Sequence, residues 1–120
     1  MSVGIWVLGD QLWQGQSALR DSGDERVPLI MIESENHVKQ RCYHQQKLVL
    51  LWSAMRHFAE ELRADAWNVT YAIAPDFITP LTQWIEEYGI TELRVMMPAN
   101  RPFLKLMQSL ELPCALTLVP

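Results

Sequence analysis

The stretch VGIWVL at residues 3–8 is apolar at every position and ends at Gly9 and Asp10. A strand with one face in solvent alternates apolar and polar residues, so an unbroken apolar run is typical of a strand covered on both faces. Glycine permits the sharp turn that ends such a strand. The sequence therefore predicts a buried strand over residues 3–8, with its carboxyl end at Gly9.

Similar runs recur along the chain, and helical patterns separate them. We expect further strands at residues 29–32, 68–73, 93–97 and 115–119. We expect helices near residues 17–20, 44–64, 77–88 and 101–110. The longest helix carries apolar residues at spacings of three and four, the pattern of one buried face: Leu48, Leu51, Met55, Phe58 and Leu62. Gly89 follows the third helix, where glycine commonly caps a helix end.

This alternation of strands and helices determines the predicted fold class. Strands separated by helices pair in parallel through right-handed crossovers. The sequence therefore predicts an α/β fold, a three-layer, doubly wound, five-stranded parallel sheet of Rossmann-like type with the strand order 3-2-1-4-5. In this order the first and fourth strands are neighbours and the winding reverses between them, which is where such sheets bind ligands. That crevice would be walled by residues 9–11 and residues 98–101.

The composition is that of a single globular domain. The chain has 120 residues, of which 49% are hydrophobic and 20% are charged, a balance that argues against disorder. The net charge of −4 argues against DNA binding by this chain alone, because that affinity depends on Lys and Arg at the phosphates. The sequence has neither an apolar run of about 20 residues that could span a membrane nor a basic signal-peptide start. Cys42 and Cys114 lie far apart, as expected for reduced thiols of a cytoplasmic protein.

Polar groups follow the first two predicted strands, at the edge where such sheets bind ligands. Asp10 supplies a hydrogen-bond acceptor, Gln11 supplies an amide, and Glu33 ends the second strand. Gly9 would let a ligand approach the backbone closely. The alternatives are an ordinary turn at Gly9 and Asp10 and, for Glu33, a solvated loop acid or the start of a helix cap. The glycines are isolated, so neither a G-x-G-x-x-G fingerprint nor a P-loop is present.

Two further features bear on ligand binding. Lys47, together with Lys39 and Arg41, forms a modestly basic region that could face an anionic ligand or a partner domain, or could be ordinary solvated lysines. Trp13 follows the first strand and could stack on an aromatic ligand at the crevice.

Residue types that bind metals cluster in one part of the chain. His37, Cys42 and His44 lie within eight residues, and the other cysteine, Cys114, is distant. A zinc site of this kind requires three or four ligands at close spacing. We therefore expect no metal at this cluster.

Four segments of the chain carry a distinctive pattern: VLGDQL at residues 7–12, IES at 32–34, YHQQKL at 43–48 and SAMRHFAEEL at 53–62. Together they resemble the N-terminal domain of the photolyase-related, iron–sulfur class of bacterial cryptochromes and (6-4) photolyases, over nearly the whole chain. The resemblance implies that this α/β domain binds an antenna chromophore of the ribityl-lumazine type. It also implies that FAD, a 4Fe–4S cluster and the pocket for the DNA lesion belong to a large helical C-terminal domain that residues 1–120 do not include.

The resemblance also indicates which residues would form the chromophore site and its edge. The positions that match the family are Gly9, Asp10, Gln11, Glu33, Lys47, Pro98 and Arg101. Family members often have an acidic residue immediately before the proline and a second acidic residue two positions after it. In this chain Met97 and Asn100 stand at those positions, so both acids are replaced.

The expected function follows from this resemblance. We expect residues 1–120 to form one antenna-type domain of a longer cytoplasmic flavoprotein. The domain would hold the chromophore and brace the helical domain of the same protein, which would contact DNA for light-dependent repair or act in blue-light sensing. Full-length relatives are DNA photolyases, which are lyases, and we expect residues 1–120 to be inactive alone. The alternatives are an interaction module without a chromophore and a free-standing flavodoxin-like nucleotide-binding protein.

Overall fold

The computed structural model describes residues 3–9, 11–13, 15–21, 26–34, 45–98 and 101–119, with side chains throughout except at residues 21 and 45–49. Its strands are β1 (Val3–Trp6), β2 (Leu29–Ser34), β3 (Val69–Ala74), β4 (Glu92–Met96) and β5 (Ala115–Val119). Its helices are α1 (Ser17–Asp21), α3 (Gln45–Ala64), α4 (Ile78–Tyr88) and α5 (Arg101–Ser109). Every element predicted from the sequence is present, with bounds that differ by a few residues.

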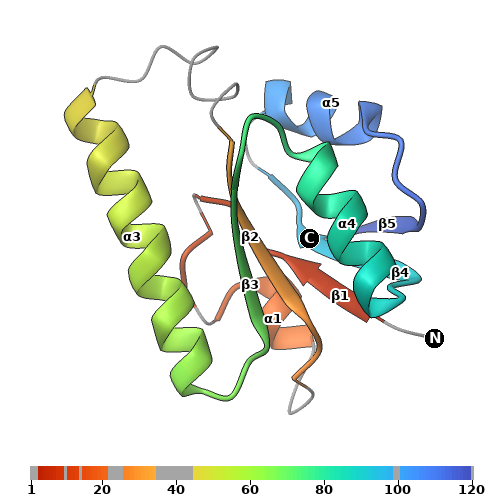
Figure 1. Cartoon of the computed structure of the whole chain (residues 1–120), viewed down its shortest axis with the longest axis horizontal. Helices are drawn as coiled ribbons and strands as arrows, with labels where there is room; N and C mark the ends of the chain where they lie inside the picture. Colours follow the sequence, from red (N-terminus) through yellow and green to blue (C-terminus); the bar gives the residue numbers. More distant parts are fainter. Residues whose placement is uncertain are drawn as a thin grey trace.

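The strands form one parallel sheet, as predicted. Their order is β3-β2-β1-β4-β5, and each neighbouring pair is parallel. The helices between consecutive strands provide the crossovers that parallel pairing requires (Figure 1). β1 lies at the centre, with β2 and β4 on either side, so the winding reverses between β1 and β4. The predicted α/β fold class and strand order are therefore confirmed.

The second strand is longer than the sequence predicts, and this changes the setting of Glu33. The apolar run predicts a strand over residues 29–32 that ends at Glu33. Instead β2 continues to Ser34, because β3 pairs with it as far as Glu33↔Ile73 and Ser34↔Ala74. The Ser34 hydroxyl also donates to the Pro75 carbonyl at 3.1 Å. Glu33 is thus a strand residue with its side chain fixed on one face of the sheet.

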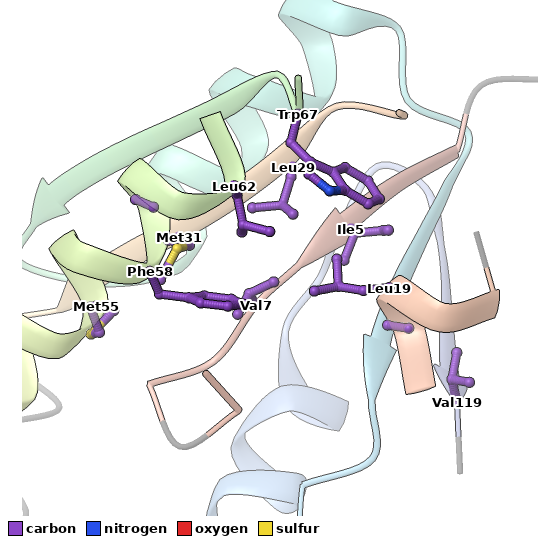
Figure 2. Packing of buried hydrophobic residues seen from close by; sticks show 12 residues of the cluster. Ile5, Val7, Leu19, Leu29, Met31, Met55, Phe58, Leu62, Trp67 and Val119 are labelled. Carbon is purple, nitrogen blue, oxygen red and sulfur yellow. The ribbon is translucent and has the colours of Figure 1, made fainter. Parts of the chain in front are cut away.

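The core is divided between the two faces of the sheet, because alternate residues of a strand point to opposite faces. Ile5 of β1 and Met31 of β2 belong to a cluster with residues of α1 and α3 (Figure 2). Trp6 and Ile30, their immediate neighbours in sequence, belong to a second cluster with residues of α4 and α5. The sheet therefore lies between two helical layers. This explains why β1 and residues 29–32 of β2 are apolar without alternation.

Two glycines are required by the backbone and the packing. An ideal Cβ at Gly4 of β1 would lie 2.4 Å from Cη2 of Trp84, so only glycine lets α4 approach the strand this closely. Gly89 has φ 62° and follows α4, and its backbone N–H donates to the Ile85 carbonyl. The sequence-based prediction of a glycine cap at this helix end is confirmed.

Candidate functional site

The loop after β1 is tied to the end of β4 by the side chain of Gln11. The Gln11 amide is buried, and its Nε2 donates to the Met96 carbonyl at 2.7 Å. Its Oε1 accepts a hydrogen bond from the Leu8 backbone N–H at 3.4 Å. The pairing of β1 with β4 ends at Ile5↔Arg94. Gln11 therefore links the two segments of the chain beyond the point where these strands stop pairing. The predicted binding residue Gln11 therefore has a structural role at the point where the winding reverses.

The other predicted residues at this edge lie in different surroundings. Gly9 faces α3, where an ideal Cβ would be 3.2 Å from Leu51 Cδ1 and 3.4 Å from Met55 Sδ. Pro98 is buried after β4, and Arg101 is exposed at the first position of α5. Asp10 and the side chain of Lys47 lie outside the described residues.

Glu33 is the centre of a polar cluster between β2, β3 and α3. Its Oε2 accepts hydrogen bonds from Arg56 Nε at 3.0 Å and from the Tyr71 hydroxyl, and its Oε1 accepts one from Arg56 Nη2 at 3.2 Å. The Arg56 contact is bidentate, the geometry that gives the strongest carboxylate–guanidinium pairs. The Glu33 side chain is 1% exposed, whereas that of Arg56 is 58% exposed. The cluster thus joins a buried carboxylate to a guanidinium that reaches solvent.

The electrostatics of the cluster favour a neutral tyrosine and a charged arginine. Burial raises the pKa of Tyr71 well above its usual range, and its hydrogen bond to Glu33 acts in the same direction. The hydrogen bond from Arg56 to Glu33, together with the attraction between their charges, raises the pKa of Arg56. Tyr71 therefore remains a hydrogen-bond donor, and Arg56 neutralises the buried carboxylate.

The raised pKa of Tyr71 predicts a loss of stability at alkaline pH. A tyrosine whose pKa is higher in the folded than in the unfolded state stabilises the fold fully below its unfolded pKa of about 10. That contribution is lost as the pH rises through the folded pKa. We expect the free energy of unfolding to fall progressively above about pH 10, and to fall less in Tyr71→Phe. Denaturant unfolding at several pH values measures how the free energy of unfolding depends on pH in the parent and in Tyr71→Phe. The same dependence in the two proteins would contradict the raised pKa of Tyr71.

The predicted site residues thus fall into two groups. Gln11 bonds to the end of β4 and Pro98 follows that strand, whereas Gly9 and Glu33 both face α3. Arg56 and Tyr71 were not predicted as site residues. Arg56 does occur in the distinctive SAMRHFAEEL segment, and Tyr71 lies two residues before Ile73, the β3 residue paired with Glu33. Strand register was the missing information, because it places Tyr71 on the same face as Glu33.

Several other sequence-based predictions concern residues near this edge. Trp6 is buried as expected, and Trp13 is 49% exposed. Across the described part of the chain, no group of three or more His, Cys, Asp or Glu side chains could hold a metal ion, and His37, Cys42 and His44 lie outside that part. Within the same residues, none of the helices combines the length and the apolar character that crossing a membrane requires.

Comparison with known proteins places the chain in a family. A stretch of 76 residues, 63% of this chain, is 34% identical to a protein of Agrobacterium fabrum (strain C58 / ATCC 33970) named (6-4) photolyase. The matched stretch spans 15% of that protein's length. The family model described as deoxyribodipyrimidine photo-lyase-related protein matches residues 5–120. The chain therefore belongs to the deoxyribodipyrimidine photo-lyase-related protein family.

Proposed function

We propose that this domain holds an antenna chromophore of the ribityl-lumazine type at the carboxyl edge of its sheet. The observation that carries the proposal is the Glu33 cluster, a buried carboxylate held by Arg56 and Tyr71 near the end of β2. Doubly wound sheets bind their ligands at this edge. Membership of the photolyase-related family supports this assignment, since the sequence resembles its chromophore-bearing N-terminal domains.

The residues present fit such a chromophore in their donor and acceptor chemistry. A lumazine has ring carbonyls and a ring N–H, and its ribityl chain carries hydroxyls. The Glu33 cluster offers both an acceptor and donors, a carboxylate that is 1% exposed and an arginine side chain that is 58% exposed. When bound, the chromophore would absorb near-ultraviolet or blue light for transfer to a flavin in a further domain. The task of this chain is to hold the ring rigidly in a fixed orientation.

A second candidate function is an interaction module that only braces another domain of the same protein. This alternative is favoured by two exposed apolar residues near the carboxyl edge, Trp13 at 49% and Met97 at 44%. Exposed apolar groups mark an interface where they form a contiguous patch. The Gln11 amide is also hydrogen-bonded to the backbone of Leu8 and Met96, so one predicted ligand contact is removed.

Titration with a ribityl-lumazine separates the two functions. We expect the purified chain to bind the compound saturably at one site, with a change in lumazine fluorescence, because a fixed ring in a shielded site loses contact with water. An interaction module predicts no binding by a correctly folded chain. Circular dichroism checks the fold in the same samples. DNA contact, FAD and the 4Fe–4S cluster belong in this proposal to the rest of a longer protein, as in the relatives that the sequence resembles.

A further inference from the structure

We infer that Arg56 is the group that contacts the ligand at this edge, and that Glu33 and Tyr71 position its guanidinium. The inference rests on the proposed function and adds a binding residue to it. In this arrangement Arg56 donates to neutral acceptor oxygens of the ligand, such as the carbonyls of a planar ring.

The hydrogen bonds of the cluster show which group is available to a ligand. A guanidinium has five N–H groups, and Arg56 uses one at Nε and one at Nη2 on Glu33. No described residue accepts from its Nη1, and the side chain is 58% exposed. Glu33, by contrast, is 1% exposed and accepts three hydrogen bonds. A molecule arriving from solvent therefore reaches the guanidinium before the carboxylate.

The positioning of Arg56 gives the site its geometric precision. A free arginine side chain samples many rotamers, and ordering it on binding reduces affinity. Here the bidentate contact with Glu33 fixes the plane of the guanidinium, and the Tyr71 hydroxyl fixes the carboxylate in turn. The remaining N–H groups of Arg56 are thereby held in one orientation before the ligand binds.

Charge balance and the neighbouring surface indicate the class of ligand. Because Glu33 neutralises Arg56 at 3.0 Å, the pair presents directed donors with little net charge. Such a site favours neutral carbonyl oxygens over phosphate groups. Ile73 is paired with Glu33 in the β2–β3 register and is 59% exposed, so apolar surface lies beside the pair on the same face. A planar, carbonyl-bearing ring matches both features.

The test is a fluorescence titration of ribityl-lumazine against matched Arg-to-Lys variants of α3. Arg56→Lys keeps the positive charge beside Glu33 but removes the planar guanidinium and its paired N–H donors. We therefore expect this variant to bind ribityl-lumazine about tenfold more weakly. Arg63→Lys is the control, because Arg63 lies two turns away in an exposed pair with Glu60. We expect that variant to bind like the parent. Thermal unfolding confirms that both variants are folded.

A second comparison tests the positioning role. Tyr71→Phe should weaken binding severalfold in the parent and cause no further loss in Arg56→Lys, because Tyr71 acts through the guanidinium. Millimolar inorganic phosphate should leave lumazine affinity unchanged. Competition by phosphate would overturn the assignment of a neutral ligand. Equal binding by the parent and Arg56→Lys would overturn the role of Arg56 and leave the proposed function standing, whereas no binding by the folded parent would overturn both.

Discussion

Trp84→Ala should lower the free energy of unfolding by about 3–5 kcal/mol, the cost typical of truncating a buried tryptophan. Trp84 of α4 is 2% exposed and packs directly on Gly4 of the central strand. Because Gly4 has no side chain, nothing on that strand position can fill the space that the indole leaves. The Trp84 Nε1–H has no acceptor among the described residues, so the truncation leaves no acceptor unpaired. The expected loss in the free energy of unfolding therefore measures the packing of the Trp84 indole.

Chemical denaturation of the parent and the variant measures this loss directly. Trp13→Ala is the matched control, since it removes the same side chain from a position that is 49% exposed. We expect the control to change stability by about 0.5 kcal/mol or less. A similar loss in the two variants would contradict the account of the core, in which α4 is held to the sheet by the contact of Trp84 with Gly4.

Glu33→Ala should weaken the binding of a ribityl-lumazine about tenfold to a hundredfold, equivalent to roughly 1–3 kcal/mol. The variant removes the acceptor that Arg56 and Tyr71 share. It therefore abolishes any direct contact of Glu33 with the ligand and also releases the guanidinium. Fluorescence titration of both proteins gives the two dissociation constants.

The control for this change is Glu60→Ala on α3. Glu60 also pairs with an arginine, Arg63, but its side chain is 71% exposed and the pair lies on the surface. Such surface pairs contribute little to stability. We expect lumazine affinity to be unchanged in this variant. Equal affinity of the parent and Glu33→Ala would exclude Glu33 from the site, both as a contact and as a positioning residue.

Much of the fold could be predicted from the sequence because local pattern and topology agree. The unbroken apolar run at residues 3–8 indicates a strand covered on both faces, and residues 5–8 are buried as that pattern requires. Gly89 marks the end of α4 through a backbone conformation that glycine adopts readily. These signals depend on a few neighbouring residues, so they can be read without knowing the rest of the structure.

The candidate site was less predictable because its contacts join residues far apart in the chain. Glu33 was identified by its place after a strand, but its partners Arg56 and Tyr71 are 23 and 38 residues away. Their meeting depends on the crossing of α3 over the sheet and on the exact β2–β3 register. Gln11 shows the same limit, since its amide bonds to Met96, which is 85 residues away. The sequence indicates the chemistry of these groups, whereas only the fold shows which partners they take.

The central claim is that a planar chromophore binds at the carboxyl edge of the sheet beside Glu33 and Arg56. The most direct measurement is the change in backbone amide NMR signals as ribityl-lumazine is added to the isotopically labelled chain. The account predicts saturable shifts concentrated in residues 9, 11–13, 33–34 and 50–56, together with a shift of the side-chain Nε–H signal of Arg56, which the same spectra record. Shifts concentrated at the opposite edge, in residues 65–69 and 89–92, would contradict it, as would a folded chain whose signals do not move at all.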